Sequence, residues 1–350
     1  MEKIFATRLK QARIMQGLSM DTLCMKANNA ITKQSISKYE AGKMMPDSKT
    51  LILLAKALEV KIDYLFRPIG ISIDHVEFRK KAKLGIKQID SIKEIVKDRL
   101  ERYFEIESII NIETNFHLNY HHIIIQEEQD IYPIANKIKH DWKLGDDGIN
   151  NLIEILEENH IKVIEIDAPK HFDGLSGYIN NDKAFIVLNK HFDSERKRFT
   201  ALHELGHLLL KFDSSIEEKR IENLCNLFAN EMLISKDVFI KKIGQNRRDI
   251  SLQELQNIQI QFGISIDALM YKAKYLNIIT ETRHKTYCIN KNTNNLFKLN
   301  VEKSRYKEDS SSRFARLVYR ALASELISIS KASVMLNIPI NEVRNKLNLV

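Results

Sequence analysis

Apolar positions in the first seventy residues recur three or four apart, which is the spacing of short amphipathic helices. Residues that favour helix starts precede three of these runs, namely Ser19, Thr32 and the pair Pro46 and Asp47. Gly17 ends the first run, and the segment IDYLF closes the set. The pattern predicts a compact domain of five short helices at residues 1–70.

Along the rest of the chain the spacing of apolar residues changes several times, from the period of helices to that of strands and back. A charged, periodic stretch at residues 75–112 predicts linking helices, either a brace packed on the next domain or a partner surface. Residues 130–276 predict a small sheet flanked by helices, with IKVIEI and KAFIVLN as buried strands. TYCINKNTNNLFKLN predicts a β-hairpin, and the last forty residues predict helices that form a cap or a second DNA-reading module.

These patterns together predict an α+β fold that is mostly helical. We expect four segments, at residues 1–70, 71–129, 130–276 and 277–350. They correspond to the five-helix domain, a helical linker, a domain with a small sheet, and a C-terminal hairpin with a helical cap.

The sequence HELGH begins at His203 and ends at His207, inside a run with the apolar spacing of a buried helix. Positions i and i+4 of a helix lie on one face, so both imidazoles can reach a single Zn²⁺. Glu204 would then lie beside the attacking water as its general base. The spacing predicts a zinc-dependent endopeptidase, a hydrolase of proteins.

A catalytic zinc site needs a third protein ligand and one position left for water. The next helical segment, Ile221–Ser235, offers Glu222 fifteen residues after His207, with Glu231 as its competitor. Asn226 lies one turn beyond Glu222 and is placed to support a ligand histidine. On spacing alone the choice between the two glutamates stays open.

Two further groups have weaker patterns. His117 and His121 also stand four apart, but no carboxylate accompanies them as in HELGH, so a metal site there is disfavoured. Tyr178, near a glycine-containing turn, is either a donor to the oxyanion or a packed core tyrosine, and packing is the commoner role.

Residues 130–275 resemble the ImmA/IrrE-type metallopeptidases. The resemblance is carried by ERKRFTALHELGHLLLKF, by ENLCNLFANEML and by DGLSGYINNDKAFIVLN upstream of them. It implies that Glu204 is the catalytic base and that the Zn²⁺ ligands are His203, His207 and Glu222. Cys225 and Ser235 replace residues usual in that family, and we expect neither to touch the metal site.

The first domain resembles the Xre/Cro helix-turn-helix family through SISKYEAGKMMPDSKTLILLAKALEV. In such domains the recognition helix enters the major groove of DNA by its N-terminal end. The resemblance therefore implies base and phosphate contacts by five residues: Lys33, Gln34, Ser37, Lys38 and Lys43. A dimerisation module with a merely solvated polar surface is the alternative.

Charge is concentrated in the same domain. Residues 1–70 contain 12 Lys and Arg against 6 Asp and Glu, which accounts for +6 of the +8 of the whole chain. A localised positive surface favours contact with nucleic acid phosphates. The three cysteines lack metal-ligand spacing and no apolar stretch is long enough to span a membrane, so we expect reduced thiols in a cytoplasmic protein.

The sequence thus predicts a transcription regulator that binds operator DNA and carries a zinc peptidase. The peptidase resemblance implies a protein substrate, a helix-turn-helix repressor or the chain itself, whose cleavage relieves repression. The alternative is a non-catalytic DNA-binding repressor or antitoxin, in which the peptidase fold is a metal-stabilised interaction domain. Helix-turn-helix proteins usually bind paired half-sites, which makes a homodimer a further expectation.

Overall fold

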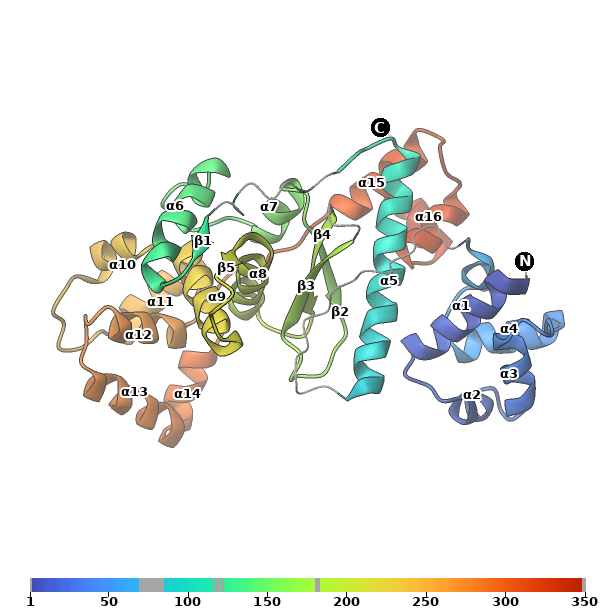
Figure 1. The fold of residues 1–350 in the computed structure, drawn as a ribbon, viewed down its shortest axis with the longest axis horizontal. Helices are drawn as coiled ribbons and strands as arrows, with labels where there is room; N and C mark the ends of the chain where they lie inside the picture. Colours follow the sequence, from blue (N-terminus) through green and yellow to red (C-terminus); the bar gives the residue numbers. More distant parts are fainter. Residues whose placement is uncertain are drawn as a thin grey trace. The chain divides into compact units, whose positions relative to one another are not determined.

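The computed structural model describes residues 2–68, 85–114, 116, 120, 123–179 and 183–347. Contacts group these residues into two units. The first contains residues 2–68, 85–114 and 312–347, and the second contains 116, 120, 123–179 and 183–311. Helices dominate both units, and the strands all lie in the second (Figure 1). The mostly helical fold with small sheets agrees with the prediction.

The first unit begins with the predicted five-helix domain. It consists of α1 (Glu2–Met15), α2 (Met20–Lys26), α3 (Lys33–Glu40), α4 (Ser48–Ala57) and the 3₁₀ helix η1 (Ile62–Phe66). The side chains of Ser19, Thr32 and Asp47 each accept a hydrogen bond from the backbone three residues later, at 3.1, 3.1 and 2.7 Å. Phe5 and Leu23 are among the fully buried residues of its core.

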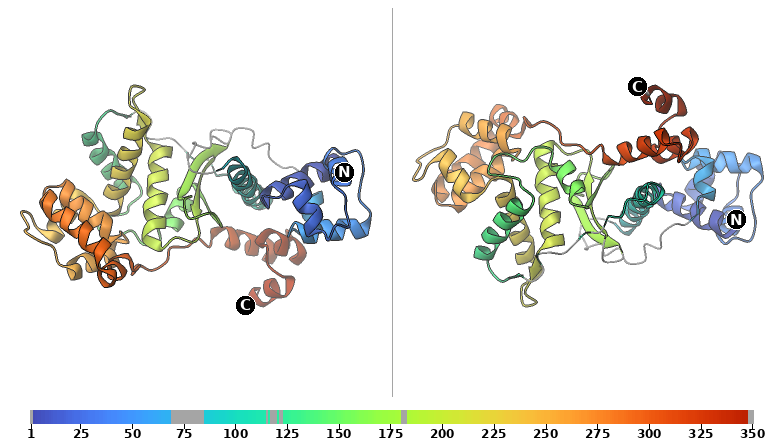
Figure 2. Two further views of the ribbon diagram at one scale, coloured as in Figure 1. Left: turned by 90° about the horizontal axis from the view of Figure 1, so that it is seen from below. Right: turned by 90° about the horizontal axis from the view of Figure 1, so that it is seen from above.

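Helices from two distant parts of the chain complete this unit. They are α5 (Ile86–Ile109), α15 (Arg313–Ala323), α16 (Ile329–Leu336) and α17 (Ile340–Lys346). Tyr103 and Ile106 of α5 share a core with Leu317 and Val318 of α15, and the two helices lie side by side (Figure 2). Lys61 donates to the Ser333 hydroxyl at 2.7 Å, which ties the five-helix domain to α16. The C-terminal helices therefore form a cap on the first unit.

A buried network of charges joins the five-helix domain to α5. The Arg67 guanidinium lies 2.7 Å from the carboxylates of both Asp98 and Glu101, and Arg8 lies 2.8 Å from Glu101. Arg102 pairs with Asp98 from the next turn of α5. Burial opposes ionisation of Asp98, but Arg102 and Arg67 together hold its pKa below the usual range.

The second unit is built on a three-stranded sheet in the order β2 (Lys162–Ile166), β4 (Lys183–Asn189), β3 (Gly174–Ile179). β2 is parallel to β4, whereas β3 is antiparallel to it, with Ser176 opposite Ile186. Residues 184–188 of the central strand are fully buried. A second, two-stranded sheet pairs β1 (Ile124–Ile125) with β5 (Lys211–Phe212).

Helix α8 (Ser194–Leu209) packs on β3 and β4, and α9 (Glu218–Leu233) packs on α8 (Figure 1). The remaining elements are η2 (Glu128–Asp130), α6 (Ile131–Asp141), α7 (Leu152–Glu158), α10 (Lys236–Ile243), α11 (Leu252–Phe262), α12 (Ile266–Tyr275), α13 (Glu281–Thr293) and α14 (Asn295–Glu302). Among the described residues, no helix combines the length and apolarity needed to cross a bilayer.

The predicted C-terminal hairpin is wrong, because its residues form α13 and α14. The Thr280 hydroxyl caps α13 by accepting from the Arg283 backbone, and the Asn294 side chain caps α14 by accepting from Phe297. Tyr287 is buried and its ring lies 6.0 Å from that of Phe297. The asparagines that suggested a turn lie on the solvated side of a helix or cap the next one.

The contacts also group the segments differently from the four predicted ones. Residues 277–311 belong with the sheet, while residues 312–347 belong with the five-helix domain. The linking helix was predicted to brace the next domain, but α5 belongs to the first unit, where it packs on the five-helix domain and the C-terminal helices. The pair His117 and His121 lies outside the described residues.

Candidate metal centre

The two histidines of HELGH lie on α8. The Asp193 side chain starts this helix by accepting from the Arg196 backbone at 3.1 Å. His203 and His207 are one turn apart, and their Nε2 atoms lie 3.1 Å from each other. Both side chains are at least nine-tenths buried. The helix thus fixes two imidazoles with their Nε2 atoms toward one point.

Glu222 reaches the same point from α9. Its carboxylate oxygens lie 3.2 Å from His203 Nε2 and 3.1 Å from His207 Nε2, and the side chain is 45% exposed to solvent. Hydrogen bonds from His203 and then His207 hold the pKa of the Glu222 carboxyl well below its usual range. Among the described residues, these three form a group whose ligand atoms all lie within 4.8 Å of one another.

The close approach of α8 and α9 depends on Gly206. A methyl group added there would lie 3.1 Å from the Phe228 ring and 3.4 Å from Cys225 Sγ. A side chain at this position would require Phe228 or Cys225 to shift by a few tenths of an ångström. The glycine of HELGH keeps Glu222 within reach of both histidines.

The donor set fits zinc. A tetrahedral site with Zn–N and Zn–O bonds of about 2.0–2.1 Å places its ligand atoms roughly 3.3 Å apart, close to the separations here. His203 Nδ1 donates to the Asn226 side-chain oxygen at 2.9 Å, and His207 Nδ1 lies 3.4 Å from Cys225 Sγ. If a cation took the place of the Nε2 hydrogens that bond to Glu222, hydrogens on the Nδ1 atoms would leave the Nε2 lone pairs for that cation. Three converging lone-pair donors are stabilised by a cation between them.

Glu204 is positioned by the strand that covers α8. It is 2% exposed, and its Oε2 accepts a hydrogen bond from the Ser176 hydroxyl at 2.9 Å. Ser176 lies on β3 between Gly174 and Tyr178, so all three occupy one face of the strand. A Cβ at Gly174 would lie 2.7 Å from Thr200, and Tyr178 donates to the Leu208 carbonyl.

The contacts of β3 therefore step along α8 from Thr200 to Glu204 to Leu208. Two strand residues span about 6.6 Å and four helix residues about 6 Å, so strand and helix keep the same register over this distance. Ser176 is the middle contact. The serine thus fixes the carboxylate in one orientation beside the histidine pair.

Several weaker predictions are settled by the contacts. Tyr178 packs against Phe116 and is hydrogen-bonded to backbone, which agrees with the core role that was favoured. Glu231 forms a buried ion pair with Lys272 at 3.1 Å, away from the histidines. The expectation that Cys225 does not touch the metal site is wrong, since its sulfur contacts His207. Ser235 caps α10.

The five residues predicted to meet DNA lie on or just after α3. All five are exposed, at Lys33, Gln34, Ser37, Lys38 and Lys43. Ile36 and Tyr39 bury the opposite side of the helix in the domain core. Lys33 pairs with Asp21 of α2 at 2.7 Å, but both side chains are exposed, and such surface pairs contribute little to stability.

Comparisons with known proteins cover both regions. Residues 156–274 match a family named peptidase M78 and described as the IrrE N-terminal-like domain, and residues 9–65 match a family described as helix-turn-helix. The chain joins a helix-turn-helix domain to an IrrE N-terminal-like domain. The metal centre lies in the match to the IrrE N-terminal-like domain, and the exposed face of α3 lies in the helix-turn-helix match.

Two curated proteins of Bacillus subtilis (strain 168) are similar to part of the chain. The SPbeta prophage-derived uncharacterized HTH-type transcriptional regulator YonR is 38% identical over 71 residues, which is 20% of this chain and 64% of that protein. The uncharacterized HTH-type transcriptional regulator YqaE is 35% identical over 80 residues, 23% of this chain and 65% of that protein. The chain thus spans just under two thirds of each.

Two contacts of the centre were not assigned by sequence reasoning. Ser176 was passed over, although its place between two glycines on the strand before HELGH was a signal. Cys225 was noted only as a departure from the family pattern. In both cases the partner lies 18 or more residues away, so the contact follows from packing and not from helical spacing.

Proposed function

We propose that the IrrE N-terminal-like domain is a zinc-dependent endopeptidase and that the helix-turn-helix domain directs it to DNA. The observation that carries the proposal is the meeting of His203, His207 and Glu222 beside the buried carboxylate of Glu204. Two imidazoles and one carboxylate leave an open position on zinc, as catalytic sites require.

In this proposal His203, His207 and Glu222 hold the metal. When bound, zinc polarises a peptide carbonyl and makes water acidic enough to lose a proton near neutral pH. Glu204 takes the proton from the attacking water on its carboxylate and later delivers it to the leaving amine. Ser176 keeps the carboxylate oriented for both transfers, and the half-exposed Glu222 lies at the side of the site that solvent reaches.

The proposed DNA contacts follow the geometry of α3. The N-terminal end of the helix presents Lys33 and Gln34 to bases, while Lys43 after its end meets phosphate. The substrate we propose is a helix-turn-helix repressor or the chain itself, cleaved so that repression ends. A second copy of the chain would supply the partner for a paired half-site.

Glu204→Gln tests the catalytic role. The amide keeps the hydrogen-bonding shape but cannot accept the proton, so zinc should stay bound while cleavage is lost. New protein N-termini can be labelled in cells that express either the wild type or Glu204→Gln, and the mass of the purified chain can be followed over time. Cleavage products that arise only with the wild type support the proposal.

The control is Glu218→Ala, an exposed glutamate at the start of α9, which should retain the wild-type products. Identical N-termini and identical transcription with wild type and Glu204→Gln would instead favour a non-catalytic repressor or antitoxin. Equal products from both chains would show that a contaminating protease cuts. Either result would reject the enzymatic proposal.

A further inference from the structure

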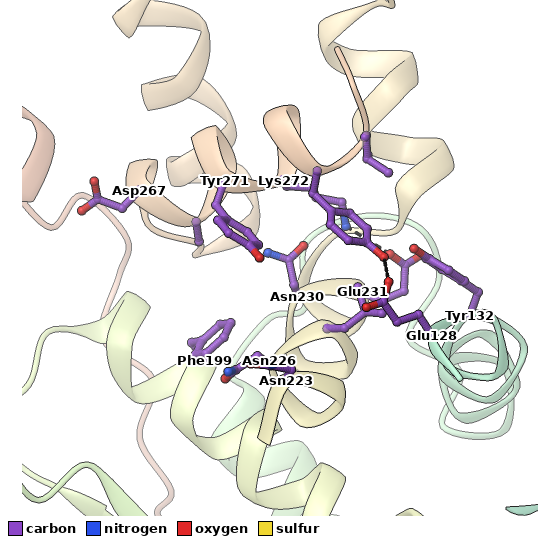
Figure 3. Close-up of a pocket in the computed structure, with 14 residues that line it drawn as sticks. Glu128, Tyr132, Phe199, Asn223, Asn226, Asn230, Glu231, Asp267, Tyr271 and Lys272 are labelled. Atoms are coloured by element: carbon purple, nitrogen blue, oxygen red, sulfur yellow. Dashed lines mark hydrogen bonds and ion pairs between the residues drawn. The ribbon is translucent and has the colours of Figure 1, made fainter. Parts of the chain in front are cut away.

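A pocket of about 490 Å³ opens beside the metal centre, lined by residues of α8, α9, α12 and the η2–α6 region (Figure 3). Its size is that of an ordinary small-ligand site. Asn226 belongs both to its lining and to the centre, because its side-chain oxygen accepts from His203. Phe199, which lies on α8 one helical turn before His203, also lines the pocket. The pocket and the metal centre are therefore adjacent and share Asn226.

Three asparagines of α9 line this pocket. Asn223, Asn226 and Asn230 follow one another along α9 and all line the hollow. The first two are exposed, whereas Asn230 is 8% exposed and projects from α9 toward α12 in Figure 3. Polar amides at the mouth and in the interior give hydrogen-bonding groups at successive depths.

The Asn230 side-chain oxygen is buried and has no hydrogen-bond partner among the described residues. A buried acceptor left unpaired destabilises the chain, so this oxygen favours any ligand that brings a donor to it. Its position in the lining of the pocket makes a donor at the tip of an entering group the natural partner.

The charged groups Glu231, Lys272 and Glu128 of the pocket already have partners. Glu231 accepts from Lys272 at 3.1 Å and from the Lys236 backbone at 2.8 Å, and Lys272 also donates to the Ile234 carbonyl. Glu128 accepts from the Tyr275 hydroxyl. The walls between them are apolar or aromatic, with Phe199, Leu227, Ala268, Tyr271 and Leu276. A ligand with an apolar stem and a single polar tip matches this lining.

We propose that this pocket is a specificity subsite that takes a substrate side chain with an apolar stem and a hydrogen-bond donor at its tip. The inference rests on the proposed peptidase, for which it names a substrate class. Glutamine and lysine side chains both carry these features and differ in charge. Asn230 is the residue that selects them, and Asn226 couples the subsite to a ligand histidine.

Binding of small probes tests the subsite without any cleavage. N-acetyl-glutamine methylamide, the lysine equivalent and the norleucine equivalent, which lacks a donor, would be titrated into the zinc-loaded full chain and followed by ligand NMR. Glutamine or lysine should bind about 10-fold more tightly than norleucine, the effect of one hydrogen bond to a buried acceptor. Whichever of the two binds more tightly identifies a neutral or a cationic donor.

Asn230→Leu should remove this preference, whereas Asn292→Leu, at an exposed asparagine of α13, should keep it. Asn230→Asp keeps an acceptor of the same size and adds a negative charge. This variant should bind both the glutamine and the lysine probe, with the ratio of their affinities shifted toward lysine. Equal binding of all three probes to the wild type, or an unchanged preference in Asn230→Leu, would overturn the subsite.

The same titrations in the Glu204→Gln chain separate this inference from the proposed function. A preference that persists there, in a chain that never cleaves, supports the subsite by itself. If wild type cleaves proteins yet shows no preference among the probes, the subsite fails and the peptidase stands. If the preference is present but no cleavage occurs in any chain, the peptidase proposal fails.

Discussion

Both units of the molecule bury clusters of ionisable side chains, but the clusters differ in composition. In the first unit, the arginines 8, 67 and 102 lie between the carboxylates of Asp98 and Glu101, so each charge has an opposite partner from the chain. In the second, two imidazoles and a carboxylate converge with lone pairs directed at one point. Clusters of paired opposite charges brace a fold, whereas we propose that a cation completes the cluster of like donors.

The largest effect should come from breaking the cluster of paired arginines and carboxylates in the first unit. Asp98→Ala leaves Arg67 and Arg102 without their shared partner, and removing one member of a buried pair costs about 3–5 kcal/mol. Urea unfolding at pH 7 measures the loss, and zinc content should not change. A loss below about 1 kcal/mol, the range of exposed pairs, would contradict the bracing role.

The pH dependence of this loss has a defined sign. Because the pKa of Asp98 is lower in the folded chain than in the unfolded one, its stabilisation is present above about pH 4 and disappears on acidification. The difference in unfolding free energy between wild type and Asp98→Ala should therefore shrink below that pH. A difference that stays constant down to pH 2 would rule out ionisation as its source.

Removal of zinc should have the next largest effect and should act on the other unit. With free zinc at a hundred times its dissociation constant, binding stabilises the folded state by about 2.7 kcal/mol, which a chelator removes. Hydrogen exchange should speed up in α8 and α9 and stay unchanged in α1 and α5. Equal acceleration in both units would mean that the centre is not a local property of the second.

Asn226→Ala should weaken zinc binding by about 10–100-fold, because the partners that orient a metal-binding histidine have effects of this size. A competition titration with a coloured zinc chelator measures the affinity. Asn223→Ala is the matched control, since Asn223 lies three residues earlier on α9 and lines the same pocket. Equal zinc affinities in the two variants would show that Asn226 does not support the metal-binding histidine.

The smallest effect should be on DNA. Lys43→Ala removes one exposed cation, so the slope of log affinity against log salt for a mixed-sequence duplex should fall by about one. The zinc content of Lys43→Ala should equal that of the wild type. A slope that does not differ from that of the wild type would place Lys43 away from phosphate.

Local patterns predicted much of the fold and the core of the site. Ser19, Thr32 and Asp47 mark helix starts through contacts three residues away, so their roles are readable from the chain. HELGH likewise places two histidines by helical period alone. The glutamate at 222 needed the family resemblance, because its position beside them depends on how α9 packs against α8.

The remaining features depend on long-range packing. Nothing in the local pattern places Ser176 against Glu204, or Cys225 against His207, or residues 312–347 on α5. The hairpin prediction failed for the opposite reason, since asparagines favour turns but also cap helices, and Asn294 does the second. Partner residues that are distant in sequence decide the first three cases, whereas the cap by Asn294 is local.

Zinc content tests the central claim most directly. The wild type, Glu222→Ala and the control Glu218→Ala would be purified without added metal and analysed by mass spectrometry under conditions that keep metals bound. We predict about one zinc per chain in the wild type and the control, as a three-ligand site holds, and a clear reduction in Glu222→Ala. No zinc in the wild type, with none taken up when zinc is added, would contradict the metal centre and the peptidase built on it.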